Sequence, residues 1–167
     1  MYAVTVLFLL FIVSQRLGEL VIAKRNTSYL LERGATEYGA THYPFMVALH
    51  TLWIVALVLS GHDKQVVWSW LIVFAVLQMF RVWILVTLGK RWTTRVIVID
   101  EPLVRAGPFR FFRHPNYMLV IAEIFVAPMA LGLWQVAAVF SILNAVMLLI
   151  RIKVEEKALA HLRPNQS

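Results

Sequence analysis

The sequence predicts an all-α integral membrane protein with five transmembrane helices, the last two forming a helical hairpin, in a single domain over residues 1–167. Of its 167 residues, 60% are hydrophobic and 15% are charged. Soluble domains average about 45–50% apolar and about 25% charged residues. A domain this small has too much surface for its volume to hide such an apolar excess. Lipid is therefore expected to cover the apolar surface that the protein cannot bury.

Five apolar segments carry this prediction, because a helix needs about 17–25 residues to cross the hydrocarbon core. They lie at about 1–23, 44–60, 66–88, 117–133 and 134–150. The last two nearly touch at Gly132, where the chain is expected to reverse. Pro128 is expected to kink the fourth helix. Residues 1–88 then hold three spans, and residues 89–167 hold a long connection, the hairpin and a tail.

Basic residues in the connecting segments predict the orientation. They are abundant in the first and third connections and in the tail: Lys24, Arg25 and Arg33; Lys90, Arg91, Arg95, Arg105, Arg110 and Arg113; Arg151, Lys153, Lys157 and Arg163. The second connection holds only Asp63 and Lys64, and the hairpin turn holds no charge. Because basic loops stay on the cytoplasmic side, an external N-terminus and a cytoplasmic C-terminus are expected.

The overall charge and the cysteine count disfavour two kinds of site. A net charge of +7 suits nucleic acid, but the basic residues sit between apolar spans, so membrane lipids are the expected partners and nucleic acid is not. The chain has no cysteine, and His42 and His50 alone do not make a metal site. No metal is expected.

The densest polar cluster covers residues 107–117, at the end of the long connection. Pro115 suits the first position of a helix, which makes His114 the N-cap. Free N–H groups at that helix start are then available for a carboxylate. An interfacial anchor of arginine and aromatic residues is the alternative. Earlier in the same connection, the β-branched run 95–99 is expected to be extended.

A second polar cluster follows the fifth apolar segment, with the sequence Arg-Ile-Lys-Val-Glu-Glu at residues 151–156. On a helix, Arg151 and Glu155 share a face, and Glu156 lies about 100° round. Adjacent carboxylates near an anionic membrane surface repel each other, and a cationic ligand would relieve that cost. An ordinary solvated helix end with an ion pair is the alternative.

Together, these clusters resemble the isoprenylcysteine carboxyl methyltransferase family. The resemblance covers residues 88–159 and rests on Gly-Pro-Phe-Arg-x-x-Arg-His-Pro-x-Tyr, an apolar hairpin and Arg-x-x-x-Glu-Glu, in that order. Family members are multi-span enzymes that use S-adenosylmethionine. Four earlier segments are similar to a bacterial branch whose acceptors include alkylated polyketide pyrones: Gln15-Arg-Leu-Gly-Glu19, Lys24-Arg-Asn26, His42-Tyr-Pro44 and Leu88-Gly89-x-x-Trp92-Thr-Thr94.

The resemblance implies an S-adenosylmethionine-dependent O-methyltransferase in a bacterial inner membrane, acting on a lipophilic acceptor. By position, the cofactor-binding residues would be Arg113, His114, Pro115, Tyr117, Glu155 and Glu156. Catalytic roles would fall to Arg151 and Glu155. Arg151 matches the family's arginine near the acceptor, and a guanidinium can hold a carboxylate or enolate by two parallel hydrogen bonds.

Ionisable residues within the apolar segments are costly, and most are expected to be paired. Arg81 is expected to pair with Glu123 or Glu19 across helices, and Arg16 with Glu19. The alternative is that Arg81 and Glu123 line the cavity for the lipid substrate.

Two other functions stay open at this point. Membrane sterol reductases use NADPH and resemble the family in a segment before their C-terminal hairpin, but their endings are typically aromatic and rich in histidine. A non-catalytic membrane subunit or a transporter is the second alternative. The chain shows no inverted halves, which disfavours a transporter. A scaffold would not need both polar clusters.

Overall fold

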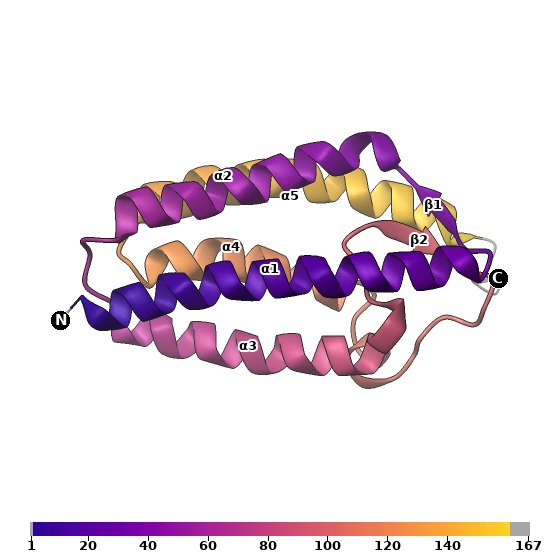
Figure 1. Cartoon of the computed structure of the whole chain (residues 1–167), viewed down its shortest axis with the longest axis horizontal. Coiled ribbons are helices and arrows are strands. Elements are labelled where there is room, and N and C mark those ends of the chain that lie inside the picture. The colour runs from indigo at the N-terminus through magenta and orange to yellow at the C-terminus, as the bar shows by residue number, and fades with distance from the viewer. Residues whose placement is uncertain (1, 161–167) are drawn as a thin grey trace.

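The computed structural model describes residues 2–160, so Met1 and Arg163 lie outside the described residues. Five helices run side by side along the long axis of the molecule (Figure 1). They are α1 (Ala3–Glu32), α2 (Tyr43–Gly61), α3 (Trp68–Leu88), α4 (Pro115–Met129) and α5 (Trp134–Ala158). Successive helices alternate in direction, so α1 begins and α5 ends at opposite ends of the bundle (Figure 1).

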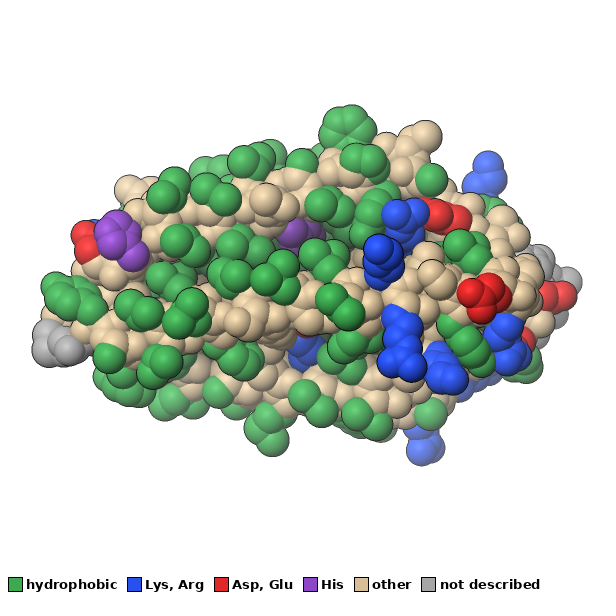
Figure 2. Space-filling view, viewed as in Figure 1, with side chains coloured by type: hydrophobic (Ala, Val, Ile, Leu, Met, Phe, Trp, Pro, Cys, Tyr) green, Lys and Arg blue, Asp and Glu red, His purple; other side chains and the backbone are tan. Residues whose placement is uncertain are grey.

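Four of the helices, α1, α2, α3 and α5, are long and apolar enough to cross a membrane. Helix α4 has only 15 residues. At 1.5 Å per residue it spans about 22 Å, less than the roughly 30 Å of the hydrocarbon core. Apolar side chains cover much of the outer face of the bundle (Figure 2). The prediction of a helical, multi-pass membrane protein is confirmed, whereas five full spans stay a prediction.

Two helices are longer than expected. Helix α1 continues to Glu32, so Lys24 and Arg25 lie on its last turns and not in a loop. Helix α5 likewise continues past Ile150 to Ala158. Hydropathy detects only the apolar part of a helix, whereas lysine, arginine and glutamate are good helix formers and extend it beyond the membrane.

Pro128 lies close to the turn between α4 and α5. Helix α4 ends one residue after Pro128, so this proline lies in the last turn of the helix, and the expected kink stays a prediction. The Pro128 carbonyl accepts hydrogen bonds from the N–H groups of Leu131 and Leu133, each at 2.9 Å. Gly132 adopts a φ of +69°, a left-handed conformation that favours glycine, and the chain reverses there as expected.

A two-stranded antiparallel ribbon lies at the end of the bundle where α1 ends. It pairs β1 (Thr36–Tyr38) with β2 (Val96–Val98), Thr36 opposite Val98. The extended run at β2 was expected, but β1 was not, because three residues are too few to show an alternating pattern. The chain is otherwise helical, as expected for an all-α membrane protein. Arg95 Nη1 donates to Glu37 Oε1 at 2.9 Å and joins the two connections.

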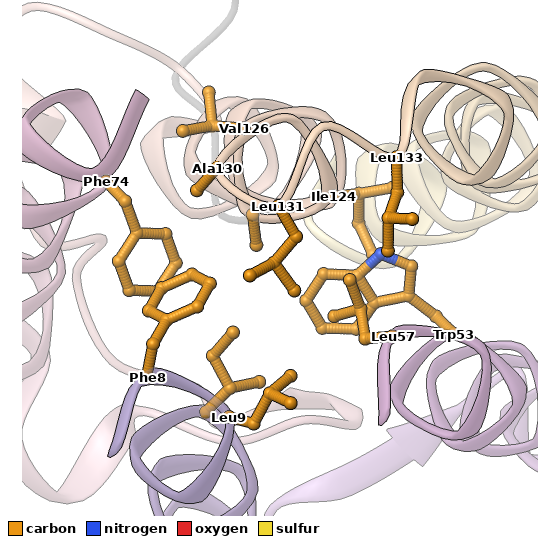
Figure 3. Packing of buried hydrophobic residues seen from close by; sticks show 12 residues of the cluster. Phe8, Leu9, Trp53, Leu57, Phe74, Ile124, Val126, Ala130, Leu131 and Leu133 are labelled. Atoms are coloured by element: carbon orange, nitrogen blue, oxygen red, sulfur yellow. The ribbon is translucent and has the colours of Figure 1, made fainter. Parts of the chain in front are cut away.

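The larger of two apolar clusters fills the opposite half of the bundle. Phe8 and Phe74 pack edge to face, 5.1 Å apart, and Trp53 lies against the α4 side of the cluster (Figure 3). Eight of the 15 residues of α4 are buried, compared with three of the 19 residues of α2. Helix α4 is thus the central helix, while α2 leaves most of its surface for lipid.

Candidate functional site

The ionisable residues of α1, α3 and α4 form one buried network. Arg81 pairs with Glu19 at 2.6 Å and with Glu123, and Arg16 pairs with Glu123 at 2.7 Å and Glu19 at 3.0 Å. The two arginines and two glutamates balance in charge. The expected pairing is confirmed, and Arg81 takes both of its candidate partners. A role for Arg81 and Glu123 in binding substrate stays a prediction.

An outer pocket of about 240 Å³ lies where the connection 89–115 meets the start of α4 and the end of α5. Of the residues expected to bind the cofactor or to act in catalysis, five line it: Arg113, His114, Tyr117, Arg151 and Glu155. Glu156 lies beside this wall, 3.7 Å from Arg113 and 3.5 Å from His114. Pro115 is buried at the helix start and shapes the backbone there.

His114 joins the start of α4 to the end of α5. It is the N-cap of α4, with Pro115 in the first turn, as expected. Its side chain makes no capping hydrogen bond and is turned toward α5, where Nδ1 lies 3.2 Å from Glu155 Oε1. The imidazole stacks on the Tyr117 ring, with ring centres 5.5 Å apart.

Electrostatics at this junction favours a protonated imidazole. The polar contact with the Glu155 carboxylate raises the pKa of His114 above its usual value near 6.5. Partial burial opposes this effect, and Glu156 adds to it. Near neutral pH, His114 therefore carries more positive charge than a free histidine.

The stability of this junction should depend on pH. Because the pKa of folded His114 is raised, its protonated form stabilises the fold below about pH 6.5, and this contribution is lost as the pH rises through the folded-state pKa. We expect His114→Gln to lower the melting temperature most at acidic pH, with a difference from wild type that shrinks toward alkaline pH. His62→Gln, at the exposed end of α2, is the control. A difference that is equal at every pH would contradict this assignment.

Arg151 is buried, with 5% of its surface exposed. Its Nη1 donates to Met46 Sδ at 2.8 Å, and its Nη2 donates to the Thr94 carbonyl at 2.9 Å. Among the described residues, Arg151 forms no ion pair with Glu155, whose carboxylate instead accepts a hydrogen bond from the Tyr117 hydroxyl. A solvated helix end with an Arg151–Glu155 ion pair therefore does not fit this structure.

A second, inner pocket of about 130 Å³ lies deeper among the helices, and all five helices contribute to its wall. Most of the wall surface is apolar. Five residues line both pockets: Trp92, Thr93, Asn116, Tyr117 and Arg151. The outer and inner pockets therefore meet at Arg151 and Tyr117.

Sequence reasoning missed several residues of these walls. Trp92 and Thr93 precede the ribbon, and Asn116 stands between the expected cofactor residues Pro115 and Tyr117. Their signal was their place inside the family-like segments, since none of them is charged. Arg81 lines the inner pocket, whereas Glu123 is fully buried behind it.

The chain resembles known proteins over most of its length. The chain is 36% identical over 159 residues to the uncharacterized protein YpbQ of Bacillus subtilis, covering 92% of this chain and 95% of that protein. It is 25% identical over 163 residues to an uncharacterized protein of Haemophilus influenzae, covering 92% and 94%. No solved structure matches the chain. Residues 70–161 match the isoprenylcysteine carboxyl methyltransferase family. With this match over more than half of its length, the chain belongs to the isoprenylcysteine carboxyl methyltransferase family.

Proposed function

We propose that this protein is an S-adenosylmethionine-dependent O-methyltransferase that acts on a lipophilic acceptor. Its family is one of membrane methyltransferases. One observation carries the finer proposal: the outer pocket and the mostly apolar inner pocket meet at Arg151 and Tyr117. Two substrates of different polarity can thus approach the same point from two sides. A single-substrate binding protein or a scaffold does not need this arrangement.

The outer pocket fits S-adenosylmethionine in its chemistry. This cofactor joins a sulfonium cation and an amino-acid group to an adenine ring, and when bound it supplies the electrophilic methyl group. Glu155 offers a carboxylate to its cationic part, and Trp92 and Phe109 offer apolar surface to its ring. His114 Nδ1 lies 3.2 Å from Glu155 Oε1, so the imidazole helps to hold this carboxylate at the pocket wall.

Arg151 would hold the acceptor oxygen. Its present partners are a thioether and a backbone carbonyl, and an anionic oxygen is a stronger partner for a guanidinium than either. A carboxylate or an enolate is already ionised, so methylation of its oxygen requires orientation and exclusion of water more than a base. Glu155 would act by holding the Tyr117 hydroxyl and His114 in position.

The outer pocket argues against the NADPH-dependent alternative. The Glu155 and Glu156 carboxylates suit a cationic cofactor better than the phosphate groups of NADPH. Three arginines of the pocket wall already face carboxylates: Arg91 pairs with Glu101, Arg95 with Glu37, and Arg113 lies 3.7 Å from Glu156.

Cofactor binding to the purified protein is the direct test. By titration calorimetry, wild type should bind S-adenosylmethionine and not NADPH. His114→Ala and Glu155→Ala should each weaken binding about tenfold, equivalent to about 1.4 kcal/mol. His62→Ala, at the far end of α2, is the matched control and should bind normally. Folded wild-type protein that binds NADPH in place of S-adenosylmethionine would overturn the proposal.

We infer that the outer-pocket end of the bundle faces the cytoplasm. Basic side chains gather over this end (Figure 2), whereas the connection between α2 and α3 at the opposite end has only Lys64. The positive-inside rule supports this orientation and, with it, an external N-terminus.

A further inference from the structure

Asn144 is a polar side chain within the apolar part of α5 that has no hydrogen-bond partner in the described part of the chain. It lies on α5, is 1% exposed, and forms no side-chain hydrogen bond with any described residue. An unpaired amide costs free energy in an apolar environment, and buried polar groups almost always have partners. Such a residue within a span is usually functional. Asn144 also lines the inner pocket.

Helix geometry sets the distance from Asn144 to the proposed reaction point. Asn144, Leu148 and Arg151 lie on one face of α5, at spacings of four and three residues, and all three line the inner pocket. Seven residues of helix rise by roughly 10 Å. The inner pocket therefore extends about that far from Arg151 into the span.

His50 adds unused hydrogen-bonding capacity to the same wall. His50 Nδ1 lies 2.9 Å from the Met46 carbonyl, which requires the proton on Nδ1 and leaves Nε2 as an acceptor. His50 and Asn144 both line the inner pocket. The Asn144 amide has a donor and an acceptor group, so the two side chains together can both donate to and accept from a ligand.

Four other buried side-chain atoms form no hydrogen bond with the described residues: Arg16 Nε, His114 Nδ1, Trp53 Nε1 and Ser141 Oγ. Of these residues, only Arg16 lines the inner pocket, and its Nε is enclosed. Two further ionisable groups of that wall, Glu19 and Arg81, are satisfied by the buried network, and Tyr117 and Arg151 lie at the other end of the pocket, where it meets the outer one. Because that network balances in charge, the deep end of the pocket suits an uncharged polar group and not an ion.

We propose that the inner pocket selects an oxygenated acceptor. Such an amphiphile carries its reacting oxygen at Arg151 and an uncharged hydroxyl roughly 10 Å away. The hydroxyl donates to His50 Nε2 or Asn144 Oδ1 and can accept a hydrogen bond from Asn144 Nδ2. This inference rests on the proposed function, which assigns the reacting oxygen to Arg151. A plain prenyl or alkyl chain leaves Asn144 unpaired, and sites built to bind a hydroxyl discriminate strongly against analogues that lack it.

A competition between two matched probes tests this proposal. Stearic acid and stearic acid hydroxylated at mid-chain are offered in equal amounts, and native mass spectrometry of the detergent-solubilised protein measures both adducts. We expect wild type to favour the hydroxylated probe by roughly five- to tenfold, the effect of one well-made hydrogen bond. Asn144→Leu should abolish the preference, and His50→Phe should reduce it. Met147→Leu, a swap of similar volume on the same wall, should retain it.

Measurements of thermal stability and of cofactor binding distinguish a failure of this inference from a failure of the proposed function. Asn144→Leu replaces an unpaired amide by an apolar side chain, so its melting temperature should equal or exceed that of wild type. Equal adducts in wild type, or a preference that survives in Asn144→Leu, would overturn the inference, and water would then be the partner of Asn144. The probe preference is measured without the cofactor. Titration of the same preparations with S-adenosylmethionine therefore tests the proposed function independently.

Discussion

Replacing Arg151 by lysine is expected to lower the rate of methyl transfer by about a hundredfold while the affinity for S-adenosylmethionine changes little. The lysine keeps the positive charge but loses the planar pair of N–H donors. The single ammonium group of a lysine, on a shorter side chain, cannot make both contacts that the two Nη atoms of Arg151 make, to Met46 and to Thr94. The acceptor oxygen would then be held by charge alone, and misplacement near the reacting atoms is costly.

The assay is the transfer of radiolabelled methyl groups to a lipid extract of the native host. Lys153→Ala, an exposed cation two residues along α5, should retain nearly full activity. If Arg151 serves only to fasten the loop at Thr94 to α5, the lysine variant should lose melting temperature and activity together. Near-normal turnover by Arg151→Lys would remove Arg151 from the reaction.

Glu123→Gln should destabilise the fold by about 3–5 kcal/mol, the usual effect of breaking a buried ion pair. The Glu123 and Arg81 side chains are only 1% and 4% exposed. Removing the Glu123 charge leaves two arginines, Arg16 and Arg81, against the single carboxylate of Glu19. The uncompensated charge is then held within the apolar region, where its solvation cost is high.

A double variant separates charge balance from the loss of particular contacts. Arg81→Met combined with Glu123→Leu leaves the neutral Arg16–Glu19 pair, and thermal unfolding in detergent should show recovery of most of the lost stability. The control is Glu101→Gln, at a solvent-screened cluster with Arg33 and Arg91, where only a small loss of stability is expected. A double variant as unstable as Glu123→Gln would show that specific hydrogen bonds, and not charge balance, maintain the network.

The sequence was sufficient to predict the features that depend on local composition. The apolar excess cannot be buried inside 167 residues, so a bundle of membrane helices follows from surface and volume alone. Proline at residue 115 places the start of α4 and makes His114 its N-cap, because the first turn of a helix does not need the missing N–H. Glycine at residue 132 likewise marks the reversal of the chain. These choices involve only neighbours along the chain.

Only the tertiary structure decided which distant residues meet. Spacing on α5 allowed Arg151 to pair with Glu155, yet packing directs Arg151 to Met46 and Thr94 and gives Glu155 to Tyr117. The ribbon, the contact of the two pockets and the unpaired amide of Asn144 also depend on how helices far apart in sequence lie against one another. Helical periodicity states which face a side chain occupies, but the group opposite that face is set by long-range packing.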